Sequence, residues 1–190
     1  MAEHDGLTGL HNRTYFQAEL ERVVERAKRD PALSGALLYL DLDNFKYVND
    51  TLGHAAGDRL LLEIAAILNK RLRKTDLLAR FGGDEFTVLL YNTAREVAMR
   101  MAEALRRQLA EYTFREAGAA VNIGSSIGVT LINAETQSAE EALSQADLAC
   151  HLAKRGGRNR VHLFNPADTM NAATMALDMG WSRRIKEAIE

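Results

Sequence analysis

Four acidic residues stand in two short stretches of otherwise apolar sequence, and their side chains are suited to joint chemistry. These residues are Asp41, Asp43, Asp84 and Glu85. The first pair ends the run A-L-L-Y-L-D-L-D, where alternation along a strand puts both carboxylates on one side. The second pair follows two glycines in R-F-G-G-D-E-F, which is typical of a hairpin turn. Converging carboxylates without histidine or cysteine predict a hard-oxygen site for Mg²⁺, with Mn²⁺ as an alternative, and hence metal-assisted phosphate chemistry.

The glycine-acid turn has a simpler explanation when it is taken alone. Two glycines supply the positive φ that a tight turn needs, and adjacent acids keep the tip of the turn hydrated. The second acidic pair at the end of a neighbouring strand is what favours a metal site over this explanation.

Periodicity and punctuation predict the elements that must position these acids. In chain order they are a helix capped by Asn12, a strand from Ala36, a helix from about Gly53, hairpin strands over 77–80 and 86–91, a helix with a Thr93–Glu96 capping box, a strand over 121–132, a helix capped by Ser138 and closed by Gly156-Gly157, and a strand over 160–164. We therefore expect an α/β (α+β) fold with a βααββαβ core of the ferredoxin-like kind, in which helices flank a central, mainly antiparallel sheet.

Composition narrows the class of protein. The 190 residues suit one domain, and a net charge of −2 with a pI of about 6.2 argues against a nucleic-acid polymer as partner. Cys150, the single cysteine, excludes an internal disulfide framework, and the five histidines lack zinc-ligand spacing. Neither a membrane-spanning run nor a signal peptide is evident, so we expect a cytoplasmic domain without membrane contact, excised from a longer protein that could itself be membrane-tethered.

Five blocks of sequence, in order, carry a resemblance to a known family. They are D-G-L-T-G-L-H-N-R from Asp5, D-L-D-N-F-K-Y-V-N-D from Asp41, G-H-A-A-G-D from Gly53, R-F-G-G-D-E-F from Arg80 and A-K-R-G-G-R-N-R-V from Ala153. The chain resembles a GGDEF domain, the catalytic module of diguanylate cyclases, over some 160 residues. The resemblance implies a nucleotidyl-cyclase-like fold and the condensation of two GTP into cyclic di-GMP, with release of two pyrophosphates.

The resemblance also implies roles for the acids. Asp41, Asp84 and the Leu42 carbonyl would bind the metals, which would gather the triphosphate and lower the pKa of the attacking 3′-hydroxyl. Glu85 would help to deprotonate that hydroxyl. Asp43 has a weaker case, since it could instead cap or orient its neighbours.

Further positions match nucleotide-binding residues of the family. Asn49 and Asp58 correspond to the pair that contacts the guanine edge, and His54 to a further nucleotide contact. Lys46, assigned to the catalytic set, and Lys154 and Arg158 correspond to phosphate contacts, while Gly82 and Gly83 would let phosphates approach the backbone. Turn chemistry and helix-terminus preferences explain several of these residue types when each is taken alone.

Arg73-Lys74-Thr75-Asp76 matches the family's inhibitory R-x-x-D site, where cyclic di-GMP binds back to the enzyme. Arginine can bind phosphate or guanine through two hydrogen bonds, and aspartate can accept from guanine N1 and N2. The short motif means little alone, and its five-residue offset from Gly82 is what gives it weight.

Residues 1–166 are expected to form the GGDEF domain, and residues 167–190 a connector helix toward a missing downstream domain. In this segment, apolar residues recur at about every fourth position, through Ala173, Leu177, Trp181, Ile185 and Ile189. The segment resembles the connector to an EAL phosphodiesterase domain, and a sensor domain is expected upstream. The alternative function is a silent GTP- or cyclic di-GMP-binding module that regulates the EAL domain. A cyclase would need a transient homodimer, because two GTP molecules attack one another.

Overall fold

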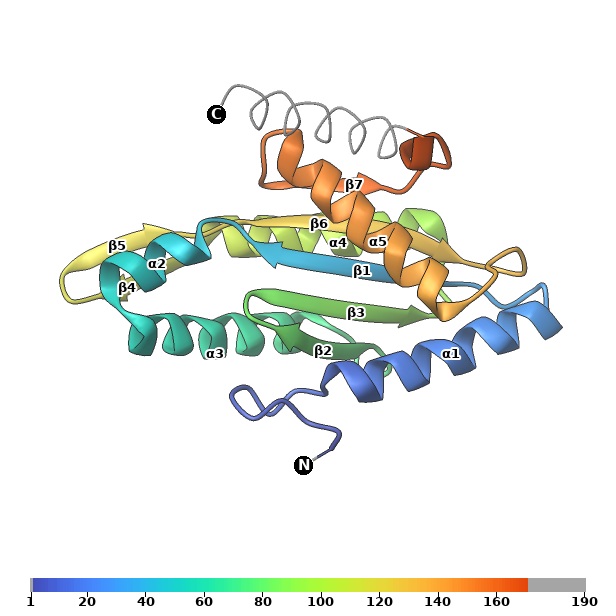
Figure 1. Cartoon of the computed structure of the whole chain (residues 1–190), viewed down its shortest axis with the longest axis horizontal. Helices are drawn as coiled ribbons and strands as arrows, with labels where there is room; N and C mark the ends of the chain where they lie inside the picture. The colour runs from blue at the N-terminus through green and yellow to red at the C-terminus, as the bar shows by residue number, and fades with distance from the viewer. Residues whose placement is uncertain (1, 171–190) are drawn as a thin grey trace, which may run out of the picture.

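A five-stranded sheet forms the centre of the computed structural model, which describes residues 2–170 (Figure 1). Its strands, in spatial order, are β2 (Leu77–Gly82), β3 (Glu85–Tyr91), β1 (Gly35–Leu42), β6 (Ser125–Ile132) and β7 (Arg160–Leu163). β6 and β7 run parallel, and the other neighbouring strands run antiparallel. A separate two-stranded hairpin consists of β4 (Thr113–Glu116) and β5 (Ala119–Asn122).

Helices cover both faces of the central sheet. They are α1 (Arg13–Arg29), α2 (Phe45–Leu52), α3 (His54–Arg71), α4 (Arg95–Glu111) and α5 (Ala139–Arg155). Leu37 and Tyr39 of β1 pack in a cluster with α1 and α5, whereas Leu38 and Leu40 pack with α2, α3 and α4. Alternate residues of β1 thus enter two cores, which explains why this strand is apolar at nearly every position.

The predicted fold class is confirmed. From β1 to β6 the main elements follow the expected βααββαβ order, β1-α2-α3-β2-β3-α4-β6. The β4–β5 hairpin is inserted between α4 and β6, α1 precedes this core, and α5 with β7 completes it. The expectation of a mainly antiparallel sheet also holds, with β7 as the parallel edge strand.

Two of the three predicted helix caps form as expected. The Asn12 side chain accepts a hydrogen bond from the Tyr15 amide at 3.0 Å, and the Ser138 hydroxyl accepts one from the Glu141 amide at 3.0 Å. The Thr93 capping box is wrong, because α4 begins after Ala94, which makes no side-chain cap. Thr93 instead donates to the Tyr91 carbonyl and accepts from Arg73 (2.8 and 3.1 Å), so its hydroxyl serves the preceding turn.

The single strand predicted over 121–132 is also wrong. Gly124 adopts a φ of +71°, which an extended strand does not tolerate, and it separates β5 from β6. β5 pairs with β4 in its own hairpin, while β6 enters the central sheet beside β1. The apolar character of the run does not change at this glycine, and for this reason periodicity alone missed the break.

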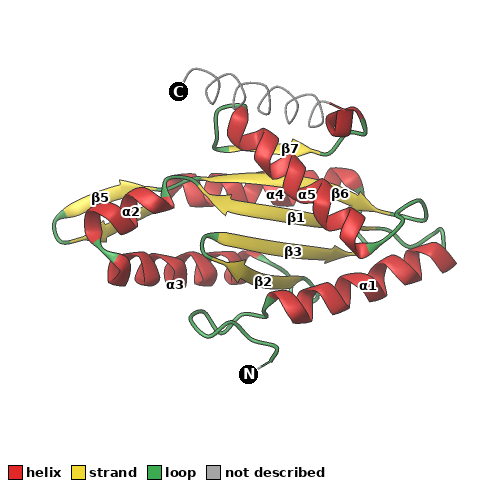
Figure 2. Cartoon of the chain, viewed as in Figure 1, coloured by secondary structure: helices red, strands yellow, loops and turns green. Residues whose placement is uncertain are grey.

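Several connections meet at one end of the sheet, drawn as green loops in Figure 2. β1 ends there next to the β2–β3 turn and the start of β6, since Asp41 pairs with Glu85 and Leu42 with Ser125. The α5–β7 loop reaches the same end, because Ser126 pairs with Arg160. All four predicted acids therefore gather at this end of the fold.

Residues 167–170 are helical, and the remainder of the predicted connector, 171–190, lies outside the described residues. The apolar stripe expected there therefore remains a sequence-based prediction. Within residues 2–170, none of the helices combines the length and apolarity needed to cross a membrane. Cys150 is buried and its thiol donates to the Ser126 carbonyl at 3.3 Å, which agrees with the expected structural role.

Candidate active site at the β2–β3 hairpin

The acidic residues of the two stretches come together as the sequence predicts, with one exception. Asp41 and Glu85 are direct cross-strand partners on β1 and β3, so their side chains project from the same face of the sheet. Asp84 occupies the turn between β2 and β3, and its backbone carbonyl accepts a hydrogen bond from the Leu42 amide at 3.2 Å. The exception is Asp43, whose two carboxylate oxygens are hydrogen-bonded to Ser126 and to the Asn159 amide.

Asp41 has the environment of a cation ligand. Its side chain is largely buried, and burial, reinforced by the neighbouring Asp84 carboxyl, raises its pKa to about 6 against the opposing effect of Lys154. One carboxylate oxygen accepts from the Lys154 ammonium. The other, Oδ1, is buried and has no hydrogen-bond partner among the described residues. A buried anionic oxygen without a partner is costly, and a bound cation would offset that cost.

The donor set fits Mg²⁺ better than a metal that demands a full protein cage. Asp41 and Asp84 supply two carboxylates, and no group of three or more His, Cys, Asp or Glu side chains with metal-binding geometry occurs within residues 2–170. Mg²⁺ binds through one or two carboxylates and completes its shell with water and substrate phosphate. The Leu42 side chain is buried in the core, so only its backbone could add a ligand.

Glu85 is held by a residue that the sequence analysis did not identify. The Tyr39 hydroxyl donates to Glu85 Oε2 at 2.9 Å, and burial together with Glu85 raises the tyrosine's pKa. The Tyr39 ring packs edge-on against Phe81 of β2, which fixes its direction. Tyr39 lies two residues before Asp41 on one strand, and this spacing is the signal that could have revealed it.

The hairpin itself is fixed by Arg80. Gly82 and Gly83 adopt φ values of +134° and +48°, as the turn prediction requires. The Arg80 guanidinium donates to the Gly83 carbonyl at 2.9–3.0 Å and forms an ion pair with Asp5 at 2.9 Å. The N-terminal D-G-L-T stretch is thereby attached directly to the turn that carries Asp84.

We expect this attachment to give the protein an acid-sensitive stability. Burial acts to raise the pKa of Asp5, but hydrogen bonds from Thr8 and the Arg80 charge hold it below its ordinary value. A depressed folded-state pKa contributes stability above the unfolded value of about 4, and this contribution is lost as pH falls through the folded value. Asp5→Asn should therefore lower the free energy of unfolding by about 1.5 kcal/mol at pH 7.

Thermal unfolding of wild type and Asp5→Asn between pH 3 and 7 tests this expectation. The difference between the two proteins should shrink below about pH 4. Asp30→Asn is a matched control, since Asp30 accepts only a local amide from Ala32 at an exposed site. A difference for Asp5→Asn that stays constant across the range would contradict the ion-pair account.

The predicted guanine contacts lie at the corner between α2 and α3. Asn49 is half-buried on α2, while His54 and Asp58 are exposed at the start of α3. Gly57 makes this corner possible, because a Cβ added there would lie only 1.9 Å from the Asn49 side-chain oxygen. Gly57 is therefore a further residue on which the site depends, and its place inside the G-H-A-A-G-D block was its only signal.

The predicted phosphate contacts surround the acids unevenly. Lys46 is exposed at the start of α2, and Arg158 is exposed in the α5–β7 loop with a φ of +61°. Lys154, in the last turn of α5, is half-buried and pairs with Asp41, and this contact raises its pKa despite burial. In the absence of nucleotide, the Lys154 ammonium thus partly neutralises the carboxylate that is predicted to bind metal.

The predicted inhibitory pair lies before β2, at the end of that strand away from the hairpin. Arg73 and Asp76 bind one another, through Arg73 Nη2 to Asp76 Oδ1 at 2.9 Å and the Arg73 amide to Asp76 Oδ2 at 2.8 Å. The Asp76 side chain is fully buried, whereas that of Arg73 is 47% exposed. Only the arginine therefore presents donors to solvent in this conformation.

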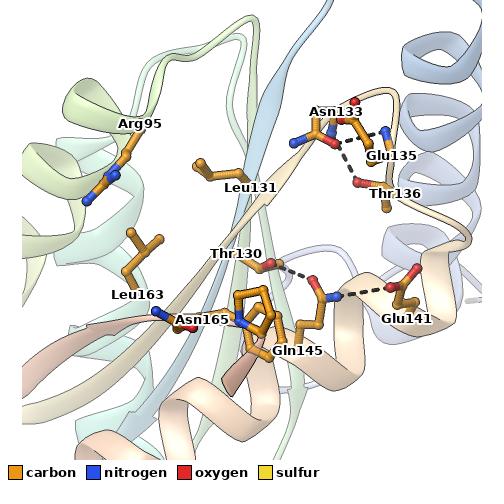
Figure 3. A pocket seen from close by; sticks show the side chains of 12 residues that line it. Arg95, Thr130, Leu131, Asn133, Glu135, Thr136, Glu141, Gln145, Leu163 and Asn165 are labelled. Carbon is orange, nitrogen blue, oxygen red and sulfur yellow. Dashed lines mark hydrogen bonds between the residues drawn. The ribbon is translucent and has the colours of Figure 1, made fainter. Parts of the chain in front are cut away.

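A large pocket lies elsewhere, at the far end of the sheet. It has a volume of about 470 Å³ and opens between the starts of α4 and α5 and the ends of β6 and β7 (Figure 3). Thr130, Gln145 and Glu141 form a chain of hydrogen bonds along one wall. None of the predicted site residues lines this pocket, so it is separate from the acidic site.

Comparison with known proteins agrees with this geometry. Residues 2–160 match the family model described as "Diguanylate cyclase, GGDEF domain". The chain is 43% identical over 189 residues to the "Probable diguanylate cyclase DgcE" of Escherichia coli, covering 98% of this chain but 17% of that protein. This chain thus spans about a sixth of that relative's length.

Solved structures are similar over most of this chain. The GGDEF domain of TpbB (YfiN) from Pseudomonas aeruginosa has a TM-score of 0.83 and 37% identity, over 90% of this chain and 99% of that one. The GGDEF domain of DgcB from Caulobacter crescentus, in complex with c-di-GMP, has a TM-score of 0.81 and 31% identity, over 86% and 96%. The chain therefore belongs to the GGDEF family of diguanylate cyclase domains.

Proposed function

We propose that this domain condenses two molecules of GTP into cyclic di-GMP. The observation that carries the proposal is the assembly of Asp41, Asp84 and Glu85 at one edge of the sheet, with a buried, unpartnered oxygen on Asp41. Similarity to named diguanylate cyclases supports it. The activity and partners of a longer protein that contains this domain are part of the same proposal.

Asp41, Asp84 and the Leu42 carbonyl would hold Mg²⁺ or Mn²⁺ in this proposal. The bound cations would supply charge stabilisation for the triphosphate and the leaving pyrophosphate. Lys154 exchanges its contact with Asp41 for one with phosphate, since cation binding to the carboxylate removes the reason for the ion pair. Lys46 and Arg158, both exposed, bind further phosphate oxygens.

Glu85 accepts the proton of the attacking hydroxyl. The 3′-oxygen of one GTP forms a bond to the α-phosphorus of the other, and the bond from that phosphorus to pyrophosphate breaks. Tyr39, which donates to Glu85 Oε2, leaves the other carboxylate oxygen for this task. The same step in the opposite direction closes the ring, so the complete reaction releases two pyrophosphates.

Asn49 and Asp58 read the guanine edge, with His54 beside them. A carboxylate can accept from guanine N1–H and the N2 amino group, neither of which adenine offers. One domain prepares one GTP, so the reaction needs two copies facing one another across their hairpins, as a transient two-fold dimer. Residues 167–190 would connect the domain to an EAL partner.

Incubation of the purified domain with GTP and Mg²⁺, followed by chromatographic separation of the nucleotides, tests the proposal. Cyclic di-GMP and pyrophosphate should accumulate in a 1:2 ratio, and ATP should give at least about 100-fold less product. Activity per molecule should rise with protein concentration over a dilution series, because the active unit is a dimer. Binding of GTP without product, with either Mg²⁺ or Mn²⁺, would replace the cyclase with a regulatory nucleotide-binding module.

A further inference from the structure

Asp43 is a buried carboxylate that joins three segments of the chain. It is 4% exposed, and its Oδ1 accepts from the Ser126 hydroxyl at 2.7 Å. Its Oδ2 accepts from the Asn159 backbone amide at 2.9 Å. Its own amide donates to the Gly124 carbonyl at 3.1 Å. The end of β1 is thus tied to the start of β6 and to the α5–β7 loop at a single residue.

The α5–β7 loop needs such a support. Arg158 and Asn159 are consecutive non-glycine residues with φ values of +61° and +47°, a left-handed conformation that is strained for such residues. The Asp43 carboxylate binds the amide of the second of them, and Arg106 of α4 donates to the Asn159 side-chain oxygen at 2.9 Å. These two contacts hold the loop in its strained form from both sides.

The other end of the contact lies at the proposed metal subsite. The peptide that joins Leu42 to Asp43 carries both the Leu42 carbonyl and the Asp43 amide, and the amide is fixed by Gly124. A Cβ on Gly124 would lie 3.4 Å from Asp43 Oδ2, which limits how far this segment can shift. The direction of the Leu42 carbonyl is therefore set by the same residue that holds the loop.

We infer that Asp43 is a positioning residue, which fixes the loop that carries Arg158 relative to the end of β1 that carries Asp41 and the Leu42 carbonyl. The inference rests on the proposed function for its consequence in catalysis, although the contacts stand without it. Both carboxylate oxygens of Asp43 already accept hydrogen bonds. Asp43 therefore acts through its neighbours and does not bind a cation.

Two substitutions separate positioning from metal binding. Asp43→Ala removes both acceptors and should lower kcat by about 100-fold, the effect of displacing groups by about an ångström. Asp43→Asn keeps the shape, because its amide oxygen can accept from the Asn159 amide while its NH₂ donates to the Ser126 hydroxyl. We expect Asp43→Asn to recover kcat to within about tenfold of wild type. A metal ligand would instead lose activity equally in both variants.

Amide hydrogen exchange gives a readout that needs no turnover. Asp43→Ala should accelerate exchange at Asn159 by about tenfold, whereas Asp43→Asn should leave it protected. Affinity for a GTP analogue that cannot release pyrophosphate should fall in Asp43→Ala through the displaced Arg158. These two measurements test the inference even if wild type makes no cyclic di-GMP, which would contradict the proposed function alone.

Asp168→Ala is the matched control. Asp168 is also a buried aspartate that accepts a backbone amide, from Asn165 at 2.9 Å, and a side chain, His162, at the far end of the sheet. This variant should lose stability as Asp43→Ala does, but keep wild-type kcat. Ser126→Ala removes one contact alone and should give an intermediate kcat, which covers the case in which Asp43→Ala fails to fold. Equal loss of kcat in Asp43→Ala and Asp43→Asn, with Asn159 still protected in the asparagine variant, would overturn the inference.

Discussion

Replacement of Asp84 by alanine should lower production of cyclic di-GMP by at least about 1,000-fold. The loss follows from the removal of one of two carboxylates that face each other at the hairpin, and with it several kcal/mol of charge stabilisation by the cations. The fold should persist, because the turn is maintained by the Asp84 carbonyl and by Arg80, neither of which needs the carboxylate. Thermal stability should stay equal or rise, since repulsion of Asp41 disappears.

Asp84→Asn is the decisive companion variant, because it keeps the volume and removes only the negative charge. It should be as inactive as Asp84→Ala. Calorimetric titration with Mn²⁺ in the presence of the GTP analogue should show weaker metal binding in both variants. Wild-type turnover in Asp84→Asn, with metal affinity unchanged, would remove Asp84 from the metal site.

Replacement of Arg73 by alanine should weaken cyclic di-GMP binding at the proposed inhibitory site by about 10- to 100-fold. A hydrogen bond to a charged group contributes about 1.5–3 kcal/mol, and Arg73 is the member of its pair that solvent and ligand can reach. Affinity for GTP should change little, since the pair lies before β2 and the proposed active site follows it. Calorimetry with cyclic di-GMP and, separately, with the GTP analogue provides both measurements.

Two further variants define the cause of that effect. Arg71→Ala, at an exposed position in the last turn of α3, removes the same charge nearby and should leave cyclic di-GMP affinity unchanged. Arg73→Lys keeps the charge but not the two-pronged geometry, and should bind with intermediate affinity. Unchanged affinity in Arg73→Ala would exclude this pair from cyclic di-GMP binding.

The sequence predicted the architecture because local rules were sufficient for it. β1 is apolar on both faces and ends in acids, two glycines with positive φ make the β2–β3 turn, and Asn12 and Ser138 cap their helices as side chains of these types do. These features depend on residues a few positions apart. The two local errors, at Thr93 and Gly124, arose where another segment competed for a hydroxyl or where a break left the apolar pattern unchanged.

Much of the candidate site was predictable as a set of positions, because the five sequence blocks name Asp41, Asp84 and Glu85 without any coordinates. Their roles remain proposals. What the blocks could not supply was the partner of each side chain. Alternation placed Asp41 and Asp43 on one side of β1, yet the two aspartates have different surroundings, one with a bare oxygen and the other with both oxygens occupied.

Only the tertiary structure decided these pairings, because they join residues that are distant in the chain. Lys154 and Asp41 are 113 positions apart, and Asn159 and Asp43 are 116 apart. Which groups meet depends on strand order and register, and these follow from packing two cores on opposite faces of one sheet. Residue types and spacing thus determined the family and the chemistry available, whereas the folded sheet decided which aspartate is left for a cation and which one holds the loop beside it.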